Sequence, residues 1–268
     1  GGGDYPGVEM IGRYHAPGSG KGWLIADTED PLTIYEHASE WNEFLVWENT
    51  PVYNDEQAGL VSSKILFFPL YPQYSGATTA TANDQFFRAL MKEKWQPASR
   101  IVPAYFDEEI YVDALAKSVE RAYAAAESKP NILVCSYHGV PRRYLMEGDP
   151  YHCQCQKTTR LLANELKWDK DYCTTTFQSK FGPEKWVGPS TVDYVAELAR
   201  KGKKNIAIVA PAFSSDCVET LEEINQEIAE SFMEAGGEKF SYIPCLNDRD
   251  DHIKALIQII ENELAGWI

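Results

Sequence analysis

Uninterrupted apolar runs mark the chain from Lys64 onward. They do not alternate with polar residues, which is the pattern of strands buried on both faces of a sheet. The runs are Ile65–Pro69, Arg100–Pro103, Ile132–Cys135, Cys173–Phe177, Ile206–Ala210 and Phe240–Ile243. Amphipathic helical stretches alternate with them, at about Thr79–Lys92, Glu109–Glu127, Lys157–Glu165, Thr191–Arg200, Val218–Glu234 and Asp251–Leu264. This order predicts an α/β fold with parallel sheets flanked by helices.

The first 61 residues follow a different pattern. Two alternating segments predict strands, and the Asp30-Pro31 pair, as N-cap and first helical residue, predicts the start of a helix. The expected elements are strands at Val8–Tyr14 and Gly22–Asp27, a helix from Asp30 to about Trp41, and a strand at about Phe44–Pro51. We therefore expect a short α+β segment at 1–61 and an α/β region at 62–268.

Composition and charge narrow the class of protein. The chain has 268 residues, of which 44% are apolar and 24% charged, as in a folded domain with a sizeable core. A net charge of −15 argues against nucleic acid and against an anionic membrane surface, but is compatible with attracting a divalent cation. No apolar run is long enough to span a bilayer.

The chain start also bears on location. Gly-Gly-Gly-Asp-Tyr-Pro has neither the basic region nor the apolar core of a secretory signal. We therefore expect a cytoplasmic protein. The missing initiator Met suggests that the sequence begins inside a longer product or carries an added start.

Six cysteines lie in the second half of the chain, and without an export signal we interpret them as reduced thiols or metal ligands. Cys153 and Cys155 form a Cys-Gln-Cys pair, with Cys135 and Cys173 each 18 residues away on either side. Four thiolates can hold a [2Fe–2S] cluster or zinc. The other interpretation, ordinary buried thiols, suits the expected strand positions of Cys135 and Cys173 and is the favoured one.

Chemistry-bearing side chains follow several of the expected strands, where ligands of parallel sheets collect. His138 comes directly after one of them, and imidazole both carries a proton near neutral pH and binds Fe²⁺. An isolated His is more often held in a loop by hydrogen bonds. Aromatic side chains such as Tyr71, Trp186 and Phe213 follow other strands, which suits a flat aromatic ligand or simply core packing.

Glu219, Glu223 and Glu227 are spaced by four along an expected helix, which places them on one face. A slightly wider helical turn would align them further. Carboxylates in a row can relay protons and hold a cation briefly. The alternative is a solvated acidic face, which is our interpretation of Glu222 and Glu230. Asp216 is an expected N-cap of this helix.

Several motifs occur in the same order as in ferrochelatases, over about 200 residues. They are Leu70-Tyr71-Pro72-Gln73-Tyr74-Ser75, His138-Gly139-Val140-Pro141, Gly148-Asp149-Pro150-Tyr151, Phe177-Gln178-Ser179-Lys180-Phe181-Gly182-Pro183, Ser215-Asp216-Cys217-Val218-Glu219-Thr220-Leu221-Glu222-Glu223-Ile224 and Tyr242-Ile243-Pro244-Cys245-Leu246-Asn247. Residues 62–268 thus resemble a ferrochelatase, most of all the alphaproteobacterial branch. The resemblance implies insertion of ferrous iron into protoporphyrin to form protohaem.

The resemblance also implies roles for individual residues. His138 would be the base or first ligand, Glu219 its partner across the macrocycle, and Glu223 and Glu227 a conduit for metal and protons. Residues expected at the porphyrin are Tyr71, Tyr74, Ser75, Trp186, Phe213 and Asp216. Insertion would need no cofactor, with Fe²⁺ and porphyrin as substrates, although some ferrochelatases carry a [2Fe–2S] cluster.

The family fold has two similar lobes, and here the first would be an incomplete remnant at 62–130 and the second would occupy 131–268. A remnant of this kind leaves two alternatives open. One is a non-catalytic porphyrin or metal binder, and the other is a cobalt or nickel tetrapyrrole chelatase.

The first segment resembles part of another family. Gly12-Arg13-Tyr14-His15-Ala16, Glu40-Trp41 and Thr50-Pro51-Val52 are similar to motifs of an uncharacterised bacterial family with a ferredoxin-like, dimeric α+β barrel fold. This resemblance implies an oligomerisation module and a homodimer.

Overall fold

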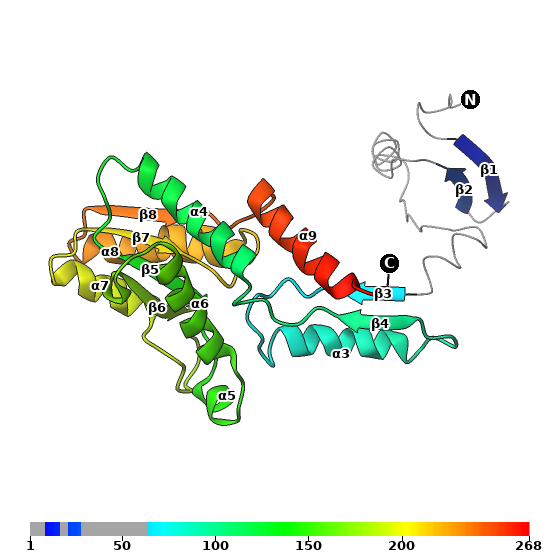
Figure 1. Cartoon of the computed structure of the whole chain (residues 1–268), viewed down its shortest axis with the longest axis horizontal. Helices are drawn as coiled ribbons and strands as arrows, with labels where there is room; N and C mark the ends of the chain where they lie inside the picture. The colour runs from blue at the N-terminus through cyan, green and yellow to red at the C-terminus, as the bar shows by residue number, and fades with distance from the viewer. Residues whose placement is uncertain (1–8, 17–20, 28–63, 268) are drawn as a thin grey trace. The chain divides into compact units, whose positions relative to one another are not determined.

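The structure, a computed structural model, describes residues 9–16, 21–27 and 64–267 (Figure 1). The chain divides into two units, Gly1–Ala58 and Gly59–Ile268. In the first, strands β1 (Glu9–Ala16) and β2 (Lys21–Asp27) pair antiparallel, with Tyr14 opposite Trp23. The two strands are confirmed. The helix expected at 30–41 and the strand expected at 44–51 lie outside the described residues.

The second unit contains a parallel sheet of four strands in the order β6-β5-β7-β8 (Figure 1). The strands are β5 (Leu133–His138), β6 (Cys173–Gln178), β7 (Asn205–Val209) and β8 (Lys239–Ile243). Successive side chains of a strand face opposite sides of a sheet, and both sides are apolar here. Leu133, Cys135 and Tyr137 enter one buried cluster, whereas Ile206 and Ile208 enter another.

Helices cover both faces of this sheet, as predicted. One face packs on α4 (Glu109–Ala125), α6 (Tyr151–Glu165) and α9 (Asp250–Leu264), and the other on α7 (Thr191–Arg200), η2 (Glu219–Ile228) and α8 (Ala229–Glu234). A short 3-10 turn, η1 (Lys170–Tyr172), precedes β6. The α/β class with parallel sheets is therefore confirmed. In the described part of the chain, no helix is long and apolar enough to cross a membrane.

Strands β3 (Lys64–Phe67) and β4 (Ala98–Ile101) form a separate parallel pair, connected through α3 (Thr79–Leu90). The prediction that these strands are buried on both faces is wrong, because none of their residues is buried. Within the described residues they pair only with each other, so too little structure packs on them. The end of α9 does reach this pair: the Arg100 guanidinium lies 4.3 Å from the Trp267 ring centroid.

Two helices differ from the expected positions. Residues Arg142–Met146 form the short helix α5 instead of a plain loop. Helix α6 begins at Tyr151, six residues before the expected start at Lys157, because the Asp149 carboxylate accepts a hydrogen bond from the Tyr151 N–H at 2.9 Å. The Cys153-Gln154-Cys155 segment therefore lies on a helix.

The expected helix at Val218–Glu234 is continuous, but its first ten residues, η2, are wound as a π-helix. Ile224, Ile228 and Phe232 are spaced by four and are fully buried, which fixes this side of the helix against the sheet. The glutamates at the same spacing therefore share another side. π-Helical turns are rare in proteins, and those that occur often lie at functional sites.

Candidate functional site

His138 and Gln178 occupy equivalent positions at the ends of the neighbouring strands β5 and β6. The His138 ring is half-buried, and its Nδ1 lies 2.7 Å from the Gly139 carbonyl oxygen. A carbonyl only accepts, so Nδ1 carries a proton, and in the neutral form of the ring the lone pair is on Nε2. This nitrogen can accept a proton or bind a metal.

Gly139 is required next to His138 by close packing. A Cβ at this position would lie 2.7 Å from the Gln178 carbonyl oxygen and 3.0 Å from the Trp186 ring. The Trp186 ring in turn packs against the exposed ring of Phe181, with the centroids 4.9 Å apart and the planes tilted by 57°. The structure therefore places Trp186, an expected porphyrin residue, beside the His138 loop.

Glu219 is the first residue of the π-helix and is half-buried. The Cys217 thiol and the Glu219 backbone N–H donate to its carboxylate and, with the charge of His138, hold the pKa of Glu219 below its usual value despite some burial. Glu219 is thus ionised at neutral pH and close enough to His138 for their charges to interact. A base with a free nitrogen and an anionic carboxylate are brought together.

Glu223 and Glu227 differ from this pair. The Glu223 carboxylate accepts hydrogen bonds from the Ser179 N–H, the Ser179 hydroxyl and the Gln178 amide. Glu227 is exposed further along the helix. In the described part of the chain, no three His, Cys, Asp or Glu side chains form a group that could hold a metal ion. The expected four-residue metal set of His138, Glu219, Glu223 and Glu227 is therefore not preformed.

Asp216 does not cap the helix as expected, because the N-cap is Val218 and no side chain caps this end. The Asp216 carboxylate instead accepts hydrogen bonds from four donors: Asn247 Nδ2 at 2.7 Å, Thr220 Oγ1 at 3.1 Å, the Cys245 N–H at 3.2 Å and the Tyr242 hydroxyl. Burial alone would raise the pKa of Asp216, but these hydrogen bonds together lower it. Asp216 therefore ties η2 to the segment after β8.

The loop after β3 is tied to two other segments. The Ser75 hydroxyl and the Tyr74 N–H bind the start of α6, at Asp149 Oδ2 (3.0 Å) and Gln154 Oε1 (2.7 Å). The Ser214 hydroxyl donates to the Leu70 carbonyl oxygen at 2.9 Å. This leaves Tyr71 43% exposed beside the loop after β7. The expected porphyrin residue Ser75 is itself buried, as an anchor of the loop.

Phe213 packs against the buried cluster on the η2 side of the sheet and is only half-buried. Its ring has an accessible part as well as a core contact. Of the expected porphyrin residues, Tyr71, Trp186 and Phe213 thus retain accessible aromatic surface, whereas Ser75 and Asp216 serve as structural hydrogen-bonding groups.

The four cysteines suggested as cluster ligands are not gathered into one group. Cys153 is exposed on α6, whereas Cys155 is buried, and Cys135 and Cys173 are buried in β5 and β6. Burial raises the pKa of Cys173 to about 11 and raises that of Cys135 further, so both remain thiols at neutral pH. The equal spacing of the four cysteines in sequence does not bring them into one group, because two lie on helix α6 and the other two in strands β5 and β6.

Comparison with known proteins decides the family. A ferrochelatase family model matches residues 52–264. The chain belongs to the ferrochelatase family. It is 62% identical over 214 residues to a ferrochelatase of Rhodobacter capsulatus, covering 80% of this chain and 61% of the relative. Ferrochelatases of Allorhizobium ampelinum and Brucella ovis are 55% and 51% identical, each over 76% of this chain and 60% and 58% of the relative.

The chain therefore spans about three fifths of the length of the curated ferrochelatases it matches. These relatives are alphaproteobacterial, as the motifs predicted. A second family model, a domain of unknown function (DUF3303), matches residues 1–66. The two matches overlap at 52–66.

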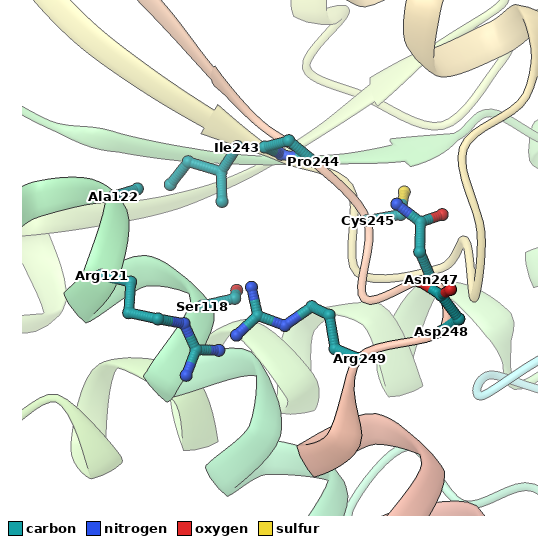
Figure 2. Close-up of a pocket in the computed structure, with 9 residues that line it drawn as sticks. All are labelled: Ser118, Arg121, Ala122, Ile243, Pro244, Cys245, Asn247, Asp248 and Arg249. Carbon is teal, nitrogen blue, oxygen red and sulfur yellow. The ribbon is translucent and has the colours of Figure 1, made fainter. Parts of the chain in front are cut away.

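A cavity of about 440 Å³ lies away from the ferrochelatase motif at His138 and Glu219, between α4, the end of β8 and the start of α9 (Figure 2). Arg121 and Arg249 line it from opposite elements, and both are paired with the Asp251 carboxylate. Asn247 and Cys245, which hold Asp216, form another part of its wall. The cavity thus adjoins the residues that bind Asp216, which holds the start of η2.

The sequence did not single out Gln178, Ser179 and Asp149 as organising residues of this candidate site. All three lie within motifs that carried the resemblance, but their roles depend on contacts 41 to 74 positions away in sequence. One signal was present: Gln178 directly follows Phe177 at the end of an expected buried strand, and in the structure it is only 3% exposed. A buried amide needs partners, so this position calls for a hydrogen-bond network.

Proposed function

We propose that the chain is a metal chelatase (a lyase) that inserts ferrous iron into protoporphyrin IX to form protohaem. Membership of the ferrochelatase family supports this, and one observation carries it: the ionised Glu219 lies close enough to His138, whose Nδ1 is held by the Gly139 carbonyl oxygen, for their charges to interact. This activity is a proposal because the chain spans only about three fifths of the length of the relatives it matches.

The chemistry requires two pyrrole N–H protons to leave as Fe²⁺ enters the macrocycle. His138 Nε2 would accept the two protons one after the other, releasing the first toward Glu227 and solvent before it takes the second, since imidazole takes up and releases protons near neutral pH. Glu219, held ionised, would stabilise the entering dication and the imidazolium. Tyr71, Trp186 and Phe213 would provide aromatic contacts to the porphyrin, and Glu227 would lie on the outer route for metal and protons.

The test is anaerobic iron insertion, followed by porphyrin absorbance, in the wild type, His138→Ala and Glu219→Gln. We expect both variants to lose at least about 100-fold in rate, the scale of general acid–base catalysis. Glu222→Gln is the matched control, since Glu222 is exposed on the same helix. Variants that insert iron as fast as the wild type would contradict the assigned roles.

A second candidate function is a porphyrin binder without turnover. The β3–β4 pair favours it, because none of its residues is buried and, among the described residues, these strands pair only with each other. Quenching of Trp fluorescence by porphyrin, without insertion, would support the binder. Competition between Fe²⁺, Co²⁺ and Ni²⁺ in the same assay distinguishes the haem branch from a cobalt or nickel chelatase.

We further propose a cytoplasmic homodimer that assembles through the first unit. The resemblance of residues 1–61 to a dimeric barrel family supports this proposal. Size-exclusion chromatography with light scattering should give twice the chain mass for the whole chain and the monomer mass after removal of residues 1–61. Equal assembly states of the two would contradict it.

A further inference from the structure

The contacts of Glu223 differ from those of a free metal-binding carboxylate. Ser179 donates twice, through its N–H at 2.6 Å to one oxygen and through its hydroxyl at 2.5 Å to the other. The Gln178 amide adds a third donor at 3.1 Å. Hydrogen bonds to a carboxylate are short and strong, so these groups hold Glu223 tightly. We call Gln178, Ser179 and Glu223 the Glu223 clamp.

Gln178 connects the Glu223 clamp to both parts of the site. Its amide N–H also donates to the Glu219 carbonyl oxygen at 2.8 Å, and its own carbonyl oxygen accepts from the Gly139 N–H at 2.8 Å. Its side-chain oxygen accepts from the buried Ser136 hydroxyl at 2.7 Å, which fixes the amide orientation. The buried Gln178 side chain therefore links β5, through Ser136, to Glu219 and Glu223 of η2, while its backbone carbonyl holds Gly139 of the His138 loop.

The backbone of Ser179 indicates that this arrangement is under strain. Its φ is +59°, in the left-handed region that non-glycine residues seldom adopt. Such a conformation persists only where surrounding contacts enforce it, and such positions cluster at functional sites. The two hydrogen bonds to Glu223 are contacts of this kind.

We propose that Gln178 and Ser179 are positioning residues that hold Glu223, and that Glu223 anchors the first turns of η2 so that Glu219 faces His138. Glu223 is then not a metal ligand or a step of the metal conduit. The kinetic consequence rests on the proposed insertion of iron, whereas the structural consequence does not. The clamp assigns a role to side chains that the reaction chemistry itself does not use.

Glu223→Gln tests the clamp with almost no change in size. The amide would present its NH₂ to one of three donors, so at least one hydrogen bond is lost. Ser179→Gly removes the side chain with its hydroxyl but keeps the backbone N–H, and glycine adopts the left-handed conformation without steric cost. Glu222→Gln is the control, because Glu222 is exposed, lies next to Glu223 and carries the same change.

The first readout is steady-state insertion with Fe²⁺ varied. We expect kcat to fall by about 10- to 100-fold in both clamp variants, the cost of a misplaced group, with KM for Fe²⁺ within about twofold. The double variant should be no slower than the slower single, because both break one unit. A raised KM for Fe²⁺ in Glu223→Gln alone, with Ser179→Gly unchanged, would show a metal ligand and overturn the clamp.

The second readout is amide hydrogen exchange at Ser179 and over residues 219–224, which requires no activity. Exchange should accelerate at least about tenfold in Glu223→Gln and stay unchanged in Glu222→Gln. Equal exchange in Glu223→Gln and the wild type would overturn the clamp. A wild type that inserts no iron contradicts the proposed function instead, and exchange then decides the clamp alone.

Discussion

Gln178, Ser179 and Asp216 each direct their polar groups at another element. Gln178 and Ser179 bind Glu223 on η2, and Asp216 binds Tyr242 of β8 and Asn247 beyond it. Between them, these contacts hold the helix that carries Glu219 from two sides. His138 and Glu219 themselves make few hydrogen bonds, so their placement depends on the contacts of Gln178, Ser179 and Asp216.

The Asp216 network yields a prediction about stability. Asp216→Asn keeps the size but cannot accept from all four donors, so we expect a loss of roughly 1–3 kcal/mol in the free energy of unfolding at pH 7. Urea denaturation measures it. Asp248→Asn is the control, since Asp248 is exposed.

The same contribution depends on pH in a defined direction. The folded pKa of Asp216 lies below its ordinary value of 3.8, so the unfolded state binds the proton more readily. The stability difference between the wild type and Asp216→Asn should be fully present above that value and shrink as pH falls through the folded pKa. A difference that grows on acidification would contradict the network.

At the scale of elements, apolar runs identified the strands and amphipathic stretches the helices, because burial on the sheet leaves a direct pattern in sequence. Strands β5 to β8 came close to their expected bounds. The start of α6 did not, since it depends on one carboxylate at Asp149. The π-winding of η2 also left no readable pattern, because residues spaced by four suit either helix type.

The residue that follows helix α3 offers a test of how little structure packs on the β3–β4 unit. Met91 follows this helix and is 77% exposed, whereas Phe232 on α8 is fully buried. We expect Met91→Gln to change the free energy of unfolding by less than about 0.5 kcal/mol. Phe232→Ala should cost about 3–5 kcal/mol. A large effect of Met91→Gln in urea denaturation would show that another segment covers this surface.

At the scale of the whole molecule, the family could be recognised from motifs that occur in the family's order. Several of these motifs follow neighbouring strands of one parallel sheet. The roles of His138 and Glu219 in one site stay a prediction, and ordinary thiols remain the favoured interpretation of the four cysteines. In the described part of the chain no metal-binding group is preformed, because equal spacing along the chain does not specify direction in space. The sequence prediction failed for β3 and β4, because an apolar run shows only that a strand prefers burial.

We propose that this chain, which spans about three fifths of the length of its relatives, catalyses repeated insertion of Fe²⁺ into protoporphyrin IX. The most direct measurement is the amount of protohaem formed anaerobically per chain with Fe²⁺ and protoporphyrin IX in excess. We predict many equivalents of protohaem per chain, and none above background in Glu219→Gln. Porphyrin binding with at most one equivalent of product would contradict the claim and identify a binder.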